Sequence, residues 1–292
     1  MSRKDLQCPT CGQGTSKFWK MKSGFPIMRC SRCGLAHLQY IEQSVNELFF
    51  NDSAKDTQQE HINNTKKDNS SSNKDKIEYW SFPNFYSKHS AVFEHFFEER
   101  LKKIRSMTPQ INSLLDIGCG YGFFLKHASE TIPIVEGIEL NKKIATYAKN
   151  QFGLNVHCIP VEEFHCDKKF DCLVMCDVLE HLENPVAILR SCQSLLNPGG
   201  ILFIQVPNLT GFRLPMGHSW GLPHHIWQFN PNSLKSILQK AGFFPQEYQT
   251  GILGVIGSYE NGGPTWFERM QWSAARKFKI GNRLQYIARC SQ

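Results

Sequence analysis

The sequence predicts an α/β domain with a largely parallel central sheet, preceded by a small metal-binding module. Two observations carry this prediction. Short apolar runs alternate with helical patterns between residues 114 and 241, as expected where helices connect parallel strands. Ahead of them, two C-x-x-C-G motifs stand close to the N-terminus of the 292-residue chain. This length accommodates one large domain and one small module.

The two cysteine motifs predict a zinc ribbon over residues 1–45, with short strands near 17–20 and 26–29. Each motif offers two thiolates on a tight turn, and four thiolates satisfy the tetrahedral preference of zinc without leaving an open position. The site is therefore expected to be structural, and metal binding contributes on the order of 10 kcal/mol to such small modules. The expected ligands are Cys8, Cys11, Cys30 and Cys33.

The role expected for the ribbon is to brace the neighbouring domain or to dock substrate. Contact with nucleic acid is the open alternative, because aromatic and basic side chains stand between and beside the cysteines. These are Phe18, Trp19, Arg29 and Arg32, which are also ordinary side chains for a ribbon.

Residues 46–78 are almost wholly polar and include a serine run, so they cannot bury enough surface to offset the entropy of ordering. We expect a flexible linker or insertion there. The α/β domain is expected over residues 79–260. It opens with a helix at 87–105 that carries apolar side chains on one face.

The next element is an apolar strand at 114–117, followed by glycines at alternate positions and then by a helix from Phe123. Glycines there let the chain turn tightly and let a ligand approach the backbone closely. The first amides of the helix favour an anionic group, so this turn predicts a nucleotide pocket. Dinucleotide-binding turns look similar. The glycines are Gly118, Gly120 and Gly122, with Asp116 just before them.

A second strand is expected at 134–139, and it ends in Glu139. An acidic residue about 20 positions beyond a glycine turn lies where a ribose binds, and it accepts hydrogen bonds from the ribose hydroxyls. Glu139 fits this place better than Glu136, which falls inside the strand. A surface acid that caps the following helix is the alternative.

Two further segments complete the pattern: F-D-C-L-V-M-C-D-V-L-E-H-L at 170–182 and L-N-P-G-G-I-L-F-I-Q-V-P-N at 196–208. With L-L-D-I-G-C-G-Y-G and G-I-E-L, they closely resemble the class I S-adenosylmethionine (SAM)-dependent methyltransferases over about residues 87–258. The resemblance implies a Rossmann-like seven-stranded sheet with helices on both faces, and SAM as the cofactor. A nicotinamide dehydrogenase does not account for the last two motifs.

The resemblance also implies roles for residues around the cofactor. Asp116 is expected to position the turn and the amino-acid end of SAM, the three glycines to allow close approach, and Glu139 to hold the ribose. Asp177 is expected near the methionine moiety. Val161 and Glu162 are expected beside the adenine, although Pro160 stands where the family more often has a polar residue.

Histidines gather where the acceptor is expected, beyond the carboxyl ends of the strands. His181 follows the fourth strand, and the loop 217–229 leads to a helix capped near Asn230. This region resembles a bacterial methyltransferase branch that often carries the same ribbon and often serves sugar and polysaccharide biosynthesis. From that resemblance His225 is the first candidate for the catalytic base and His181 the second. The alternative role is anchoring of the loop for His225 and a backbone hydrogen bond at a helix start for His181. The substrate-side candidates are His218, Trp220 and His224.

The segment 261–292 is basic and aromatic, and the resemblance fades there. Packing on its own domain or on a second subunit, as in a homodimer, is the expected role. Peripheral contact with an acidic membrane surface is the alternative.

Composition sets the remaining expectations. The net charge of +7 permits an anionic substrate but does not require one. Eleven cysteines without an apolar leader or a run of about 20 apolar residues favour a cytoplasmic protein with thiols and metal rather than disulfides.

The expected function is methyl transfer from SAM to an oxygen or carbon atom of a small molecule, a nucleotide-linked sugar or glycan intermediate being favoured. RNA methylation with the ribbon holding RNA, O-methylation of a quinone or lipid, and a non-catalytic SAM-binding module remain alternatives. The intact glycine turn and Glu139 argue against the last of these.

Overall fold

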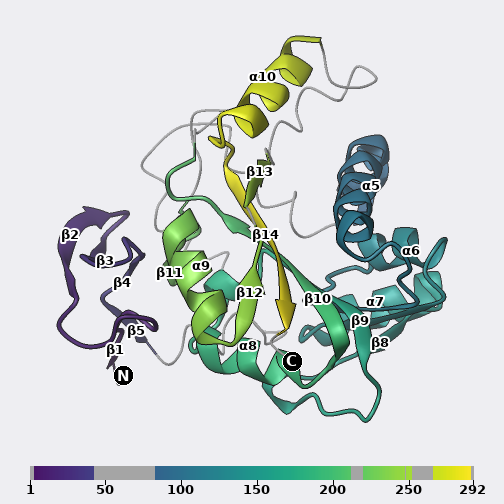
Figure 1. Cartoon of the computed structure of the whole chain (residues 1–292), viewed down its shortest axis with the longest axis horizontal. Coiled ribbons are helices and arrows are strands. Elements are labelled where there is room, and N and C mark those ends of the chain that lie inside the picture. Colours follow the sequence, from purple (N-terminus) through teal and green to yellow (C-terminus); the bar gives the residue numbers. More distant parts are fainter. Residues whose placement is uncertain (1–2, 43–82, 212–219, 247, 252–265, 291–292) are drawn as a thin grey trace.

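The computed structural model describes residues 3–42, 83–211, 220–246, 248–251 and 266–290. The predicted linker at 46–78 and His218 therefore lie outside the described residues. Figure 1 shows the chain as a small N-terminal sheet beside a larger α/β layer structure.

The N-terminal module consists of short strands. β2 (Ser16–Lys22) and β3 (Phe25–Cys30) form the antiparallel hairpin expected from the sequence. β4 (Ala36–Leu38) pairs with β3, and β1 (Arg3–Asp5) pairs with β5 (Tyr40–Glu42).

The central sheet has eight strands, seven of them in the order β12-β14-β10-β9-β6-β7-β8, with β13 pairing beside β12 on β14. The strands from β10 to β8 are parallel, and β14 is antiparallel to its neighbours. This confirms the predicted methyltransferase-type α/β fold. The strands are β6 (Ser113–Ile117), β7 (Ile134–Ile138), β8 (Asn155–His157), β9 (Phe170–Cys176), β10 (Leu196–Pro207), β12 (Phe243–Pro245), β13 (Gln249–Gly251) and β14 (Arg283–Cys290).

Helices cover both faces of this sheet (Figure 1). One apolar cluster joins Leu114 and Phe203 of the sheet to α5, α6 and α7, and another joins Leu115 and Leu202 to α8 and α9. Neighbouring strand residues thus face opposite layers, as the two-residue period of a strand requires. The helices are α4 (Pro83–Lys88), α5 (Ser90–Met107), α6 (Phe123–Ser129), α7 (Lys142–Phe152), α8 (Pro185–Gln193), α9 (Pro231–Lys240) and α10 (Trp266–Lys277), with one-turn helices η1 (Val161–Glu163) and η2 (Leu179–His181).

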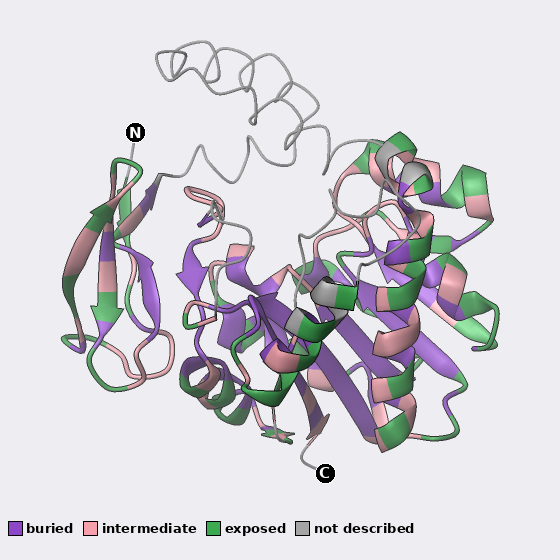
Figure 2. Cartoon of the chain, turned by 90° about the horizontal axis from the view of Figure 1, so that it is seen from above, coloured by how far each residue is buried: buried purple, intermediate pink, exposed green. Residues whose placement is uncertain are grey.

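The ribbon shares a sheet and an apolar core with the large domain. β11 (Trp227–Gln228), from the loop before α9, pairs with β4, so the order β11-β4-β3-β2 crosses from one unit to the other. Ile27 and Leu35 of the ribbon belong to the same buried cluster as Phe229. Figure 2 shows the ribbon alongside the domain, with buried strands facing it. The ribbon is therefore packed into the domain rather than tethered to it.

The C-terminal segment corrects one predicted boundary. The α/β domain does not end near residue 260, because β14 pairs with β10 from Ile201↔Arg289 to Pro207↔Arg283 inside the sheet. Leu284, Tyr286 and Ala288 alternate as buried residues, which is the period of a strand. The alternation of buried residues was missed in the sequence because basic residues, Arg283 and Arg289, stand near the two ends of the strand.

α10 packs on α5, as the first of the two alternatives for this segment expected. Trp272 is buried beside His95 and Phe96, with ring centroids 6.1 and 5.8 Å apart, and Arg276 pairs with Glu99 at 2.7 Å. Among the described helices, none combines the length and apolar character needed to cross a bilayer.

Candidate functional site

The parallel strands reverse their order of connection between β6 and β9, which are neighbours in the sheet. β7 and β8 extend the sheet on one side of this point and β10 on the other. Ligands of open α/β sheets bind beyond the carboxyl ends of the strands at such a reversal. The segments that follow β6, β7, β9 and β10 meet there, and they carry the residues described below.

The glycine turn after β6 has three positive φ angles, 75° at Gly118, 55° at Gly120 and 80° at Gly122. A Cβ at Gly118 would lie 2.3 Å from Val178, and one at Gly122 would lie 2.8 Å from Leu154. At Gly120 a Cβ would meet nothing within 4 Å. Gly118 and Gly122 thus serve the packing of the turn, while Gly120 faces the space that a ligand would fill.

Glu139 ties this turn to the next one. Its carboxylate accepts hydrogen bonds from the backbone N–H of Gly120 at 3.0 Å and of Asn141 at 2.9 Å. Burial raises its pKa, while these backbone N–H groups oppose the shift. Glu136 is engaged elsewhere, because it pairs with His157 at 2.7 Å and with Lys168. A half-buried carboxylate beside Gly120 suits the hydroxyl groups of a ribose.

Asp116 lies on β6 and is almost fully buried. The pKa of Asp116 is raised to about 7, mainly by burial. The charge of Arg100 opposes this shift, and the charge of Glu139 adds to it. The guanidinium of Arg100 lies 4.3 Å from the centre of the Phe124 ring, on the helix that follows the glycine turn. The two carboxyl groups and Arg100 set the charge on this side of the pocket.

The raised pKa of Asp116 predicts how the stability of the ligand-free protein depends on pH. In the unfolded chain the group has a pKa near 4, so between about pH 4 and 7 the folded state binds more protons. Its contribution is therefore present in full below that window and is lost as pH rises through it. Asp116→Asn should remove about 2 kcal/mol of the pH dependence between pH 5.5 and pH 8.5, measured by urea unfolding, because roughly half of the window lies above pH 5.5. Equal pH dependence in both proteins would contradict the assignment.

Asp177 follows β9 with a positive φ of 55°. The side-chain amide of Gln205 donates to one carboxylate oxygen at 2.8 Å, and Nε of Arg283 lies 2.8 Å from the other. The N–H of Arg283 does not point at that oxygen, so this contact is an ion pair without a hydrogen bond. The two partners come from β10 and β14, and the sequence reasoning missed both, since only the sheet order places them beside Asp177.

The predicted adenine-side residues lie in η1, after β8. Val161 is buried in the core that also holds α8, while Glu162 is exposed. Their contact with adenine remains a prediction.

Two predicted catalytic residues come together. The rings of His181 and His225 are perpendicular, with centroids 4.6 Å apart. Nδ1 of His181 lies 3.1 Å from the carbonyl oxygen of His224. Burial lowers the pKa of the His181 ring. Burial also lowers the pKa of the His224 ring to about 4. The ring of His225 lies against Gly221, where a Cβ would come within 2.3 Å of it.

Glu180 is a further residue of this cluster that the sequence reasoning did not single out. Its side chain is fully buried, and neither carboxylate oxygen has a hydrogen-bond partner among the described residues. Burial, followed by the charge of Asp177, raises its pKa well above the usual range. A carboxylate oxygen and one ring nitrogen each of His181 and His225 lie within 4.8 Å of one another. Such a set can share a proton or accept a cation. The sequence did offer a signal for Glu180, because an acidic residue stands next to a histidine in an otherwise apolar segment.

The four cysteines of the ribbon are also brought together, with all four sulfurs within 4.8 Å of one another. The Sγ atoms of Cys8 and Cys33 are 3.6 Å apart, close to the separation of about 3.8 Å that tetrahedral Zn–S bonds of 2.3 Å require. The N–H of Cys11 points to Sγ of Cys8 at 3.4 Å, and the glycines after each pair have positive φ. The donor set and its spacing fit a zinc ion.

Comparison with known proteins agrees with this architecture. A family model described as a methyltransferase domain matches residues 91–247, just over half of the chain. The ubiquinone biosynthesis O-methyltransferase of Coxiella burnetii is 31% identical over 116 residues, covering 37% of this chain and 50% of the relative. That of Glaesserella parasuis is 36% identical over 108 residues, covering 33% and 46%. The chain thus spans about half the length of these curated relatives.

Solved structures show the same fold. A SAM-dependent methyltransferase of Thermotoga maritima, described as a possible histamine N-methyltransferase, has a TM-score of 0.52 at 18% identity, covering 73% of this chain and 98% of that one. Streptomyces venezuelae DesVI has a TM-score of 0.50 at 18% identity, covering 71% and 95%.

The fold and the glycine-turn pocket define an α/β protein of the class I SAM-dependent methyltransferases. The chain belongs to the methyltransferase-domain family, with a four-cysteine cluster in an N-terminal ribbon. This confirms the resemblance inferred from the four motifs.

Proposed function

We propose that this protein transfers a methyl group from SAM to an oxygen or carbon atom of a small molecule, and that the acceptor is a nucleotide-linked sugar or glycan intermediate. The observation that carries the proposal is the pairing of Gly120, whose missing side chain leaves open space, with the half-buried carboxylate of Glu139 at 3.0 Å. The proposal includes a structural zinc ion on the four cysteines and a cytoplasmic location.

When bound, SAM supplies a methyl carbon that is already electrophilic, so the protein mainly has to position and deprotonate the acceptor. Glu139 would accept hydrogen bonds from the ribose hydroxyls, and Asp116 and Asp177 would hold the amino-acid end. His225 removes the proton from the acceptor. The carbonyl of His224 accepts the Nδ1 proton of His181, which fixes that ring at the edge of His225.

The role of His225 predicts a variant with intact cofactor binding and little turnover. His225→Gln should lower kcat at least 100-fold, because a general base contributes about 10²–10⁴ to the rate, while the Kd for SAM stays within twofold. The rate is measured by methyl incorporation from labelled SAM into a panel of nucleotide-linked sugars, and the Kd for SAM is measured by calorimetry. His165→Gln is the matched control, because His165 is exposed after η1. Full activity in His225→Gln would reject this choice of base.

The curated relatives favour a second candidate, O-methylation of a hydroxylated quinone ring, since both are named as ubiquinone biosynthesis O-methyltransferases. The same labelled-SAM assay with hydroxylated quinols separates the candidates. Incorporation into quinols without incorporation into nucleotide-linked sugars would select the second. Failure of the zinc-loaded protein to bind SAM or its demethylated product would reject both.

A further inference from the structure

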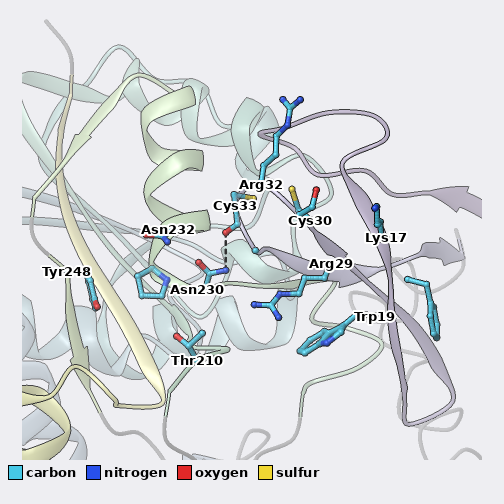
Figure 3. A pocket seen from close by; sticks show the side chains of 14 residues that line it. Lys17, Trp19, Arg29, Cys30, Arg32, Cys33, Thr210, Asn230, Asn232 and Tyr248 are labelled. Carbon is cyan, nitrogen blue, oxygen red and sulfur yellow. Dashed lines mark hydrogen bonds between the residues drawn. The ribbon is translucent and has the colours of Figure 1, made fainter.

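A groove of about 680 Å³ separates the ribbon from the start of α9 and the end of β10 (Figure 3). Its ribbon wall comes from β2, β3 and the second cysteine turn, and its opposite wall from Thr210 and the residues around Asn230. Pockets for small ligands commonly measure 300–1,000 Å³. The groove is therefore large enough for a nucleotide, and both units of the fold are needed to form it.

The described residues that line the groove give it positive charge. Lys17, Arg29 and Arg32 are among them, and none of these described lining residues is an aspartate or a glutamate. None of the three forms an ion pair within the described part of the chain, in contrast to Arg276 and Arg283 of the large domain. Guanidinium groups bind phosphate oxygens with two parallel hydrogen bonds, which makes arginine well suited to phosphate recognition.

The opposite wall adds groups that favour an anion. Asn230 caps α9, a helix of ten residues, and Pro231 and Asn232 of its first turn line the groove. Helix N-termini stabilise negative charge. The side-chain amide of Asn230 also donates to the carbonyl of Cys33 at 3.2 Å, so the cysteine turn and the helix start are held across the groove from each other (Figure 3).

Aromatic rings stand next to the charges. Trp19 lies beneath Arg29, whose guanidinium carbon is 5.0 Å from the ring centroid, and the neighbouring Phe18 is 60% exposed (Figure 3). Trp19 is half-buried and also has the ammonium of Lys20 at 4.0 Å from its ring centroid. Aromatic rings beside cations stack on planar bases. A purely inorganic anion would not need these rings.

Trp19 also connects the groove to the histidine pair. Its ring centroid is 5.9 Å from that of Trp220, and the next residue, Gly221, lies directly against the ring of His225. Packed side chains thus link this wall of the groove to the proposed base.

We infer that this groove binds the nucleoside diphosphate part of the methyl acceptor, with phosphates on Arg29 and Arg32 and the base on the aromatic rings. The inference rests on the proposed function and assigns the nucleotide part of its acceptor to this groove. The volume of about 680 Å³ between two walls suits a single nucleotide.

Calorimetry on the full zinc-loaded chain tests the inference, with UDP, dTDP, GDP and pyrophosphate as probes. At least one nucleoside diphosphate should bind, and more tightly than pyrophosphate. Arg29→Gln and Arg32→Gln should each weaken that binding tenfold or more, since hydrogen bonds to charged groups are strong. Trp19→Leu should reduce the preference over pyrophosphate. Lys22→Gln, at the far end of β2, is the matched control and should have no effect.

SAM binding is measured on the same samples, so that two failures can be told apart. If the wild-type protein binds SAM but binds none of the nucleoside diphosphates, the inference is overturned and the proposed function stands. If the wild-type protein does not bind SAM, the proposed function is rejected. Binding of a single-stranded RNA that depends on Arg29, without binding of nucleoside diphosphates, would also overturn the inference. Arg29→Lys, which keeps the charge, should restore part of the affinity and so excludes misfolding as the cause.

Discussion

Glu139→Ala is expected to abolish measurable SAM binding while the fold persists. In the proposed cofactor site the carboxylate would accept hydrogen bonds from two ribose hydroxyls, each worth about 1.5–3 kcal/mol, so their loss should weaken binding by roughly 10²–10⁴. The variant also loses the bonds from the N–H groups of Gly120 and Asn141, which hold the two turns together. Isothermal calorimetry with SAM and its demethylated product measures the effect.

Glu136→Gln provides the matched control for this experiment. Glu136 lies on β7, three residues before Glu139, and its buried carboxylate has other partners, His157 and Lys168. The variant should lose some stability and keep its affinity for SAM. If both variants bind SAM like the wild type, the ribose is held elsewhere and the pocket assignment is wrong.

Removal of metal from the cysteine cluster is expected to destabilise the large domain as well as the ribbon. Metal binding supplies on the order of 10 kcal/mol to the folding of small zinc modules. Loss of the ribbon would leave β11 without its partner β4 and would expose the core shared by Ile27 and Phe229. Thermal unfolding should therefore shift to clearly lower temperature on chelation, with zinc release measured by a colorimetric chelator.

Cys30→Ser should reproduce the effect of the chelator, whereas Cys158→Ser, at an exposed cysteine, should not. SAM binding should survive better than methyl transfer in the metal-free protein, because Gly120 and Glu139 follow β6 and β7 while the histidines lie beside β11. An unchanged unfolding temperature after complete zinc loss would contradict the integrated core.

The sequence predicted those parts of the fold that have local patterns. The glycine turn, the strands on either side of it, the ribbon hairpin and the Asn230 cap of α9 each depend on residues close together in the chain. The candidate residues for the cofactor and the base were named from motifs, and the structure brings His181 and His225 together.

What escaped prediction depends on contacts between distant segments. Arg283 became a partner of Asp177 only because β14 inserts between β10 and β12, which no local pattern specifies. The same holds for the pairing of β4 with β11 and for the groove that it creates. The side chains that pack against Gly118 and Gly122 also come from later elements, while the contact of these glycines with the cofactor stays a prediction.

The strand pairing between β4 and β11 divides the molecule's chemistry between separate stretches of sequence. Under the proposed function, the residues assigned to the methyl donor follow the first two strands of the large sheet, whereas the wall assigned to the acceptor is built jointly by the first forty residues and the segment before α9. Selection could then change which compound is modified through substitutions in the ribbon and leave the donor site untouched.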